Sequence, residues 1–385
     1  MSHKNSILNQ IIQIVPRHEF EKSVKKYKGD FASKGFTCWE QFVSMLFAQL
    51  SGQTGLRGIE TALTSIKSML YHLGVKNIKR STLSYANNNR PSEIYENVFN
   101  NLLAKILKME RTHKHRFKNP LFSIDATTID LCLSVFPWAK FRKTKGGIKM
   151  NVKLDHRGYI PVFVSVTTAN KHEVSSVKTM EFQKGDVITF DRGYTDFKQF
   201  ASYCNAGIYF VTRLKKNADY KVVHRNDVSE YENISSDQII EMKGFYTSKK
   251  CPLQLRRIRS KDPETGKYIV ILTNHFDWAP TTISAIYKDR WQIEIFFKTI
   301  KQNLKIKKFF GTTRNAVMTQ IWIALITHLM LQYLKMLSSG GWTHYTLMKL
   351  LPTILTTKKD LWTVLNKLPP PGRKNPGSNF QLELL

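Results

Sequence analysis

The hydrophobic period of the chain changes near residue 120, and this change constrains the fold more than any other feature. Before it, apolar residues recur at three- and four-residue spacing, which is typical of helices. After it, short β-branched segments separated by glycine-bearing turns predict strands at Leu121–Leu133, Ile148–Asp155 and Ile160–Thr168. Consecutive strands joined by turns pair antiparallel, so the sequence predicts a meander.

Helices and strands alternate after this meander. The pattern predicts a helix at Val174–Lys178, a buried strand at Val187–Phe190, a helix at Phe197–Asn205 and a strand at Gly207–Thr212. Such an alternation adds parallel strands to the edge of a sheet. The expected fold class is therefore α/β, with a mixed five-stranded sheet flanked by helices.

The segment 215–282 is polar and hairpin-like, unlike the sequence on either side. Its predicted strands are Val222–His224, Leu253–Arg259 and Tyr268–Thr273. Helical periodicity returns over Ile283–Leu304 and again over Ala316–Leu337. We therefore expect a β-rich insertion followed by two long helices.

The sequence before the meander is expected to be helical. Apolar residues follow the helical period over Cys38–Leu50, Leu56–Leu73 and Ile94–Met109. Arg80 stands beside Lys79 at a Ser/Thr helix start, which fits a short helix-turn-helix-like unit and equally an ordinary capped helix in a bundle.

The charge of the chain indicates its class of partner. Lysine and arginine total 59 against 29 acidic residues, a net charge of +30, while 42% of the 385 residues are hydrophobic. A folded protein with so cationic a surface most often binds nucleic acid, and an anionic membrane surface is the alternative.

No membrane partner is expected from the apolar segments. The first, Ile7–Val15, is too polar for a signal peptide, and Ile321–Leu337 is interrupted by polar side chains, which favours a buried helix. Cys38, Cys132, Cys204 and Cys251 lack the spacing of a zinc site and fit a reducing cytoplasm.

Two aspartates occupy positions where a sheet commonly presents chemistry. Asp125 lies within the first predicted strand, and Asp191 directly follows the buried strand Val187–Phe190. Side chains from adjacent central strands lie close enough to share a metal ion. By position alone, however, an aspartate at a strand end is more often a turn-forming residue.

A polar stripe follows the first of the two long helices. Tyr287, Glu294 and Lys301 are spaced by seven, and Arg290 lies four residues before Glu294, so all four are expected on one face. By spacing alone, a solvated, salt-bridged face explains this stripe better than a functional site.

The residues of this stripe and the two aspartates also carry a resemblance. The string Tyr287-x2-Arg290-x3-Glu294-x6-Lys301, preceded by Ile124–Thr128 and by Asp191–Tyr194, resembles the signature of DDE transposases of the insertion sequence four family. Trp291–Glu294 is similar to that family as well, and Asn5–Phe20 resembles the small N-terminal domain that many members carry.

This resemblance implies a ribonuclease-H-like core split by the β-rich insertion. Asp125, Asp191 and Glu294 would be the catalytic carboxylates and would hold two divalent cations, normally Mg²⁺, with Mn²⁺ able to substitute. Tyr287, Arg290 and Lys301 would bind DNA phosphates beside the cleavage site.

The resemblance also implies a division of the chain into six segments. They are an N-terminal helical domain (1–75), a helical DNA-binding segment and linker (76–118), the first part of the catalytic core (119–214), the insertion (215–282), the second part of the core (283–340) and a C-terminal tail (341–385).

The implied function is that of a transposase that binds the ends of an insertion sequence, cleaves DNA through a hairpin intermediate and transfers the strand to a target. Its partners would be double-stranded DNA, both terminal inverted repeats and target, and a second copy of the chain on that DNA. The implied location is the bacterial cytoplasm, in association with the nucleoid. A ribonuclease-H-like nuclease without strand transfer and a non-catalytic DNA-binding protein derived from a transposase are the alternatives.

Three further residues are weaker candidates for DNA contact. Trp278 is the only tryptophan of the insertion and a candidate for stacking on an extruded base, although a packing role is the stronger alternative. Lys143 and Lys145 belong to a cationic turn after the first strand, which fits either a duplex backbone or a solvated charge run.

Overall fold

The computed structural model describes residues 5–31, 33, 35–76, 78–109, 113–169, 177, 179–304 and 308–367. The chain divides into two compact units. We call residues 109–298 the sheet unit and residues 1–108 with 299–385 the helical unit. Each is described by itself.

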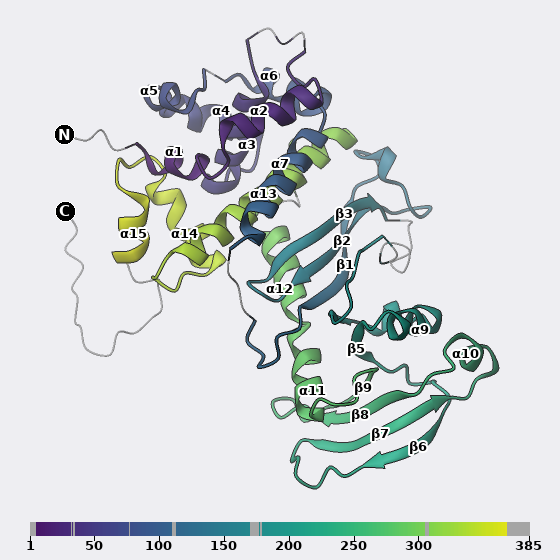
Figure 1. The fold of residues 1–385 in the computed structure, drawn as a ribbon. Coiled ribbons are helices and arrows are strands. Elements are labelled where there is room, and N and C mark those ends of the chain that lie inside the picture. Colours follow the sequence, from purple (N-terminus) through teal and green to yellow (C-terminus); the bar gives the residue numbers. More distant parts are fainter. Residues whose placement is uncertain are drawn as a thin grey trace. The chain divides into compact units, whose positions relative to one another are not determined.

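One mixed sheet of nine strands runs through the sheet unit, in the order β3-β2-β1-β4-β5-β9-β8-β7-β6 (Figure 1). The strands are β1 (Leu121–Leu131), β2 (Gly146–Asp155), β3 (Ile160–Thr168), β4 (Val187–Phe190), β5 (Tyr209–Arg213), β6 (Tyr220–Asn226), β7 (Ile234–Met242), β8 (Leu255–Lys261) and β9 (Tyr268–Thr273).

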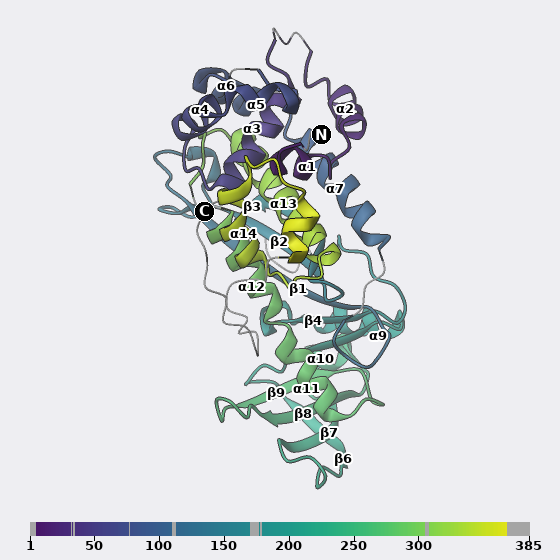
Figure 2. The same cartoon turned by 90° about the vertical axis from the view of Figure 1, so that its left-hand side faces the viewer.

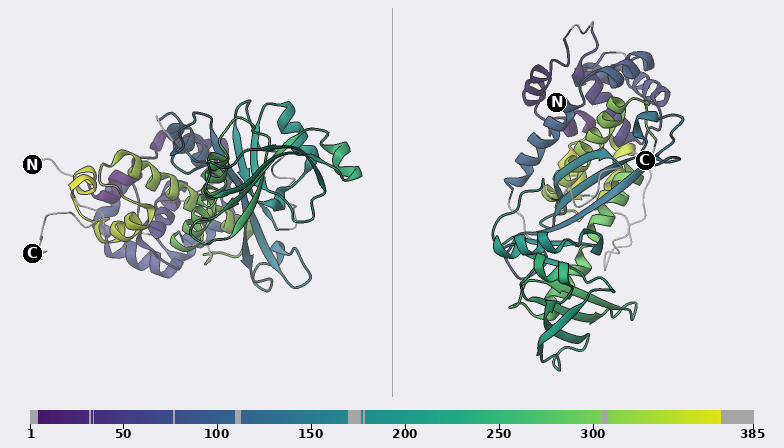
Figure 3. Two further views of the ribbon diagram at one scale, coloured as in Figure 1. Left: turned by 90° about the horizontal axis from the view of Figure 1, so that it is seen from below. Right: turned by 90° about the vertical axis from the view of Figure 1, so that its right-hand side faces the viewer.

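The five strands predicted for the core are β1 to β5. The first three form the expected antiparallel meander, visible side by side in the right-hand view of Figure 3. β4 then pairs parallel with β1, and β5 pairs parallel with β4. The expectation of a five-stranded sheet was wrong in one respect, because four more strands continue the same sheet.

These four additional strands come from the β-rich insertion. β9 pairs antiparallel with β5, so the backbone groups along that edge of the core are hydrogen-bonded to the insertion. The insertion contains β7, which the sequence pattern did not predict, and the helix α10 (Phe245–Lys250).

The two faces of the sheet bury different residues. Phe122 and Ile124 of β1 belong to the cluster that packs on α9 (Phe197–Asn205). Leu121 belongs to the opposite cluster, with Ile283 and Ile286 of α11 (Pro280–Asp289). Because side chains alternate along a strand, Ser123 and Asp125 share the face of Leu121.

The helix predicted at Ile283–Leu304 is not continuous. α11 ends at Asp289, and α12 begins at Gln292 and ends at Lys298. Arg290 and Trp291 form a turn between them, where the amides bond three residues back, Arg290 to Tyr287 and Trp291 to Lys288. A π-helix, Thr299–Asn303, follows α12, and the helical unit includes it.

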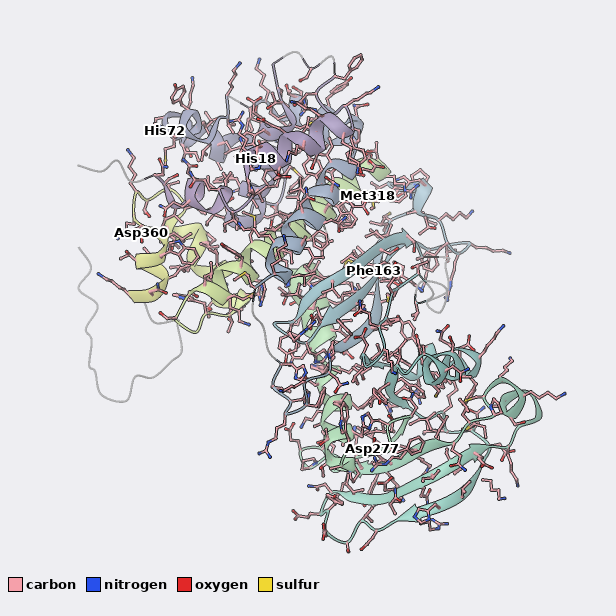
Figure 4. The ribbon with its side chains drawn as sticks, viewed as in Figure 1. His18, His72, Phe163, Asp277, Met318 and Asp360 are labelled. Atoms are coloured by element: carbon pink, nitrogen blue, oxygen red, sulfur yellow. The ribbon has the colours of Figure 1, made fainter. Side chains whose placement is uncertain are left out.

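The short elements of the sheet unit connect these helices and strands. They are the 3-10 helices η2 (Pro137–Ala139) and η3 (Arg192–Tyr194). Most of the helix predicted at Val174–Lys178 lies outside the described residues. Phe163 on β3 and Asp277 in the loop after β9 are labelled in Figure 4.

The N-terminal part of the helical unit is helical, as predicted, but the span Leu56–Leu73 is divided among three short helices. Its N-terminal elements are α1 (Ile7–Ile12), α2 (Arg17–Lys26), α3 (Cys38–Ser51), α4 (Leu56–Ser65), α5 (Lys67–Leu70), the 3-10 helix η1 (Tyr71–Leu73), α6 (Arg80–Asn89) and α7 (Glu93–Leu107). A capping box at Thr37 and Glu40 starts α3, and Gly52 in the left-handed region ends it.

The long helix α13 (Arg314–Leu337) is the centre of the helical unit. It packs against α3, α6 and α7 (Figure 2). α13 is long and apolar enough to cross a membrane, but 89% of its most apolar window is buried inside the protein. The prediction of a buried helix at Ile321–Leu337 is therefore confirmed.

The segment 341–385, expected as a tail, contains two helices. α14 (His344–Ile354) and α15 (Leu361–Lys367) bury Leu347, Leu351 and Leu365. Residues 368–385 lie outside the described part of the chain. Cys38, Cys132, Cys204 and Cys251 are free thiols.

Candidate active site

Asp125 and Asp191 come from neighbouring parallel strands. β1 and β4 pair in a register that sets Ser123 opposite Thr189 and Ile124 opposite Phe190. Asp125 is the next residue of β1, and Asp191 directly follows β4. The two carboxylates therefore lie at the same level of the sheet and on the same face.

Arg290 links the first aspartate to the glutamate of α12. Its Nη2 donates a hydrogen bond of 2.8 Å to Glu294 Oε1, and its Nη1 lies 3.7 Å from Asp125 Oδ2. The Arg290 side chain is only 12% exposed, so solvent screens these contacts weakly. One guanidinium thus bridges two of the three predicted carboxylates.

Tyr287 links α11 to the remaining aspartate. Its hydroxyl donates a hydrogen bond of 3.4 Å to Asp191 Oδ1. The Arg290 guanidinium lies 5.7 Å from the centre of the Tyr287 ring. Tyr287, Arg290 and Glu294, expected on one face of a helix, are therefore brought together around the two aspartates.

Burial and charge shift the pKa of both linking side chains. Burial raises the pKa of the Tyr287 hydroxyl and Asp191 adds to this effect, whereas Arg290 and Arg213 act to lower it. Burial acts to lower the pKa of Arg290, but Tyr287, Glu294 and Asp125 outweigh it, so the pKa is raised. Arg290 stays a cation at any pH at which the protein is folded.

The sequence reasoning missed Arg213. It is the last residue of β5, and the parallel pairing of Thr189 with Val211 sets Arg213 level with Asp191. Its charge acts on Tyr287. Arg213 directly follows a predicted strand, which is the same positional signal that singled out Asp191.

Trp291 is a second residue that the sequence reasoning did not assign to the site. It occupies the turn between α11 and α12, next to Arg290, and is 58% exposed. Its place in the motif, three residues before Glu294, is the signal that could have indicated it.

Trp278 has a packing environment. Its ring stacks on Phe117 at a centroid distance of 4.2 Å and on His275 at 3.9 Å. Its carbonyl oxygen accepts a hydrogen bond of 2.6 Å from Arg256. These contacts favour the packing alternative over a role in stacking on a base.

The other predicted site residues belong to other elements of the fold. Lys143 and Lys145 are exposed in the turn before β2. Arg80 is exposed at the first residue of α6, and Lys301 lies in the π-helix Thr299–Asn303; both belong to the helical unit. Their contact with DNA stays a prediction.

The donor chemistry of the carboxylates suits a hard divalent cation. Carboxylate oxygens are the ligands that Mg²⁺ and Mn²⁺ prefer. Within the described residues, no three histidine, cysteine, aspartate or glutamate side chains are close enough together to hold a metal ion. Arg290 supplies the positive charge next to Asp125 and Glu294.

A protein-family model covers the segment that contains these residues. The model of the transposase DDE domain matches residues 116–330, which is more than half of the chain. The chain belongs to the DDE transposase family. A domain of unknown function, DUF4372, matches residues 3–76.

Curated relatives of this transposase carry the same description. A putative transposase (y4zB) of Sinorhizobium fredii is 32% identical over 65% of this chain and 70% of its own length. A probable transposase for an insertion sequence element of Geobacillus stearothermophilus is 27% identical, over 68% of each chain.

A solved structure is similar at a lower level. The piggyBac transposase synaptic complex with hairpin DNA matches 90% of this transposase and 77% of that chain, at 11% identity and a TM-score of 0.45. A score at this level carries no argument about the site.

Proposed function

We propose that this transposase cuts the ends of an insertion sequence and joins the freed 3′ ends to target DNA, with Asp125, Asp191 and Glu294 as its catalytic and metal-binding carboxylates. The observation that carries the proposal is the pair of contacts made by Arg290 and Tyr287. Through them, residues far apart in the sequence meet on one face of the sheet.

Two Mg²⁺ ions are the proposed cofactor, with Mn²⁺ able to replace them. When bound, such ions activate the attacking oxygen and stabilise the leaving oxygen of an in-line displacement at phosphorus. Asp125, Asp191 and Glu294 would hold them. The chemistry of these three side chains supports a Mg²⁺ site, because their carboxylate oxygens are hard, negatively charged ligands.

Arg290 would move from the carboxylates to a DNA phosphate. Its planar fork binds a phosphate bidentately, and a cation replaces it as the counter-charge of Asp125 and Glu294. Tyr287 would orient Asp191 through its hydrogen bond. Arg213, level with Asp191, supplies a second positive charge for a phosphate at this edge.

A ribonuclease-H-like core is the fold proposed around this site. The order β3-β2-β1-β4-β5, with an antiparallel meander and two parallel strands, supports it. The insertion strands β6 to β9 would then be a continuation of that core sheet.

Double-stranded DNA is the proposed partner, both as terminal inverted repeats and as target. Cutting two ends together calls for two copies of the chain on DNA. Exposed cations at Arg80, Lys143 and Lys145 are proposed contacts with the duplex backbone. A cytoplasmic, nucleoid-associated location in a bacterium follows from this partner.

An exposed aromatic residue near the cut would stabilise a sharply bent strand. Trp291 has the exposure that stacking on an extruded base requires, whereas the Trp278 ring already stacks on Phe117 and His275. We therefore propose Trp291 for this role in place of Trp278.

A time course on an end-labelled transposon end tests the proposal. Arg290→Ala and Lys301→Ala should accumulate nicked ends, because hairpin formation needs the bent strand to be held and the first nick does not. The loss of a charge-assisted contact should slow hairpin formation about ten- to a hundredfold. Glu294→Gln should stop every step.

Two outcomes would contradict this reading. Equal slowing of nicking and hairpin formation would remove Arg290 and Lys301 from the distorted strand. A wild-type protein that nicks but never joins pre-cut ends to a target would be a nuclease, and one without metal-dependent nicking would be a DNA-binding protein.

A further inference from the structure

A second group of charged side chains lies beside the carboxylates, and no step of the proposed chemistry uses it. Ser123 Oγ lies 2.6 Å from His156 Nε2, and His156 Nδ1 lies 2.8 Å from Asp289 Oδ2. His115 Nε2 lies 3.3 Å from the same oxygen, and Lys114 Nζ lies 2.6 Å from Asp289 Oδ1. We call these five residues the Asp289 network.

The direction of the hydrogen bonds follows from the chemistry of the groups. An ionised carboxylate only accepts, so His156 Nδ1 and His115 Nε2 donate to Asp289. In a neutral His156 ring, Nε2 is then the acceptor for the Ser123 hydroxyl. The three groups form a chain from β1, through the turn after β2, to the end of α11.

This chain has the connectivity of a hydrolytic serine–histidine–aspartate triad, but it is inaccessible. Ser123 is 0% exposed, His156 2% and Asp289 3%. A nucleophilic serine must be reached by its substrate. The Asp289 network therefore acts inside the fold.

The position of Asp289 is electrostatically unfavourable without these partners. It is the last residue of α11, where the helix dipole favours cations. Burial acts to raise the pKa of Asp289, but hydrogen bonds from His115, His156 and Lys114 outweigh it and hold the pKa far below its usual range. A negative charge is thus maintained at this point by two other segments, residues 114–115 and the turn after β2.

The turn that carries His156 is also held in an uncommon backbone conformation. Tyr159 has a φ of 56°, in the left-handed region, and its ring lies 5.5 Å from that of His156. Such a conformation persists where the surroundings fix it. Asp289 contributes to raising the pKa of Tyr159 to about 12, after burial, so the tyrosine is part of the same surroundings.

The network joins the two elements that carry the active site. Ser123 is two residues before Asp125 and on the same face of β1, and Asp289 directly precedes Arg290. The end of α11 is therefore attached to β1 twice, through Ser123–His156–Asp289 and through Asp125–Arg290.

We infer that Ser123, His156 and Asp289 are positioning residues of the transposase site, which hold the turn between α11 and α12 against β1 and so set Arg290 and Glu294 opposite Asp125. The inference rests on the proposed function. A displacement of about 1 Å at reacting groups costs about a hundredfold in rate, so a small change in this attachment has a large effect.

Ser123→Ala and Asp289→Asn test the inference, with Ser260→Ala as a matched control. Ser260 Oγ lies 2.8 Å from Ser284 Oγ, so this control also removes a buried hydroxyl that joins a strand to α11, but at a distance from the turn. The nicking rate constant and the DNA dissociation constant are measured for each full-length variant, together with amide hydrogen exchange over residues 286–295.

We expect nicking to fall about tenfold in Ser123→Ala and about a hundredfold in Asp289→Asn, with DNA affinity within about twofold of wild type. The double variant should be no slower than Asp289→Asn, because the two residues act through one chain of contacts. Ser260→Ala should nick at the wild-type rate. A purely structural role would lower binding and nicking together.

Hydrogen exchange separates this inference from the proposed function. Ser123→Ala should raise exchange over residues 286–295 relative to Ser260→Ala, whether or not the wild type cuts the chosen DNA. If Ser123→Ala leaves exchange in that segment unchanged, or nicks at the wild-type rate when the wild type is active, the network does not position the site. If the wild type does not cut DNA but exchange rises in Ser123→Ala as expected, the proposed function is contradicted and this inference is not.

Discussion

The Arg290 guanidinium is the counter-charge between the carboxylates of Asp125 and Glu294. Its removal should therefore have opposite effects on metal binding and on catalysis. In the protein without DNA, a divalent cation must compete with the guanidinium for Asp125 and Glu294. Arg290→Gln removes the competing charge but keeps a polar side chain. We expect this variant to bind Mn²⁺ more tightly and to form the hairpin more slowly.

The contacts of Arg290 give the size of the effect. Its 2.8 Å hydrogen bond to Glu294 is charge-assisted and worth about 1.5 to 3 kcal/mol. The 3.7 Å approach to Asp125 is beyond a normal hydrogen bond and adds less. Since 1.4 kcal/mol corresponds to a factor of ten, Mn²⁺ should bind about ten- to a hundredfold more tightly to Arg290→Gln.

Electron paramagnetic resonance of free Mn²⁺ measures this affinity directly, without DNA and without turnover. Lys288→Gln is the matched control, because it removes a positive charge two residues before Arg290, where Lys288 pairs with Glu264 on the surface. The control should bind Mn²⁺ as the wild type does. Hairpin formation by Arg290→Gln should slow about ten- to a hundredfold, since its phosphate contact is lost.

Two results would refute the competition between Arg290 and the cation. If Arg290→Gln binds Mn²⁺ with unchanged or lower affinity, the guanidinium does not compete with the cation. If Lys288→Gln tightens binding as much as Arg290→Gln, the effect comes from net charge alone.

The remaining predictions concern the site, the DNA interface and the fold. Asp125→Ala and Asp191→Ala should still bind the transposon end in gel-shift assays but should lose nicking, because metal ligands stabilise charge that develops in the transition state. Substantial nicking by either variant in Mg²⁺ would remove that residue from the site. The DNA affinity should fall about 10³- to 10⁵-fold between 50 and 200 mM salt if roughly 6 to 10 phosphates are contacted, and a flat log–log plot would argue against an extended interface. Trp291→Ala should slow hairpin formation with little effect on stability, whereas Trp278→Ala should lower the melting temperature. The reverse pattern would make Trp278 the residue that stacks on a base and Trp291 the packing residue. Arg256→Ala leaves Asp237 buried without its 2.6 Å ion pair and should destabilise the protein by about 3 to 5 kcal/mol in urea unfolding, so an unchanged transition would show that the pair is dispensable.

Elements with one simple pattern were predictable from the sequence. The predicted bounds of β4 and α9 are those of the structure, because an apolar run and an amphipathic period each fix a single arrangement. β7 was missed for a physical reason: its buried residues include Asp237 and Gln238, so polar side chains satisfied by Arg256 and Arg257 replace the apolar alternation.

The candidate site was predictable in its residues but not in its contacts. The motif placed Asp125 within a strand, Asp191 directly after a strand and Glu294 on a helix. It did not predict the turn at Arg290, because helical spacing continues across it and only the backbone hydrogen bonds change. Nor did it predict Asp289, because a buried acid next to a motif arginine has no periodic signal.

Because β9 pairs antiparallel with β5, the strands of the insertion extend the core sheet from one edge. Each further strand is added beyond the last, and the outermost, β6, is largely exposed, with Lys221 and Arg225 among its charged side chains. Charged outer strands of this kind resist pairing with other chains. Hairpins gained or lost at β6 would leave β1, β4 and their carboxylates in the same register. The outer border of the insertion can therefore change in length while the strands that carry Asp125 and Asp191 keep their pairing.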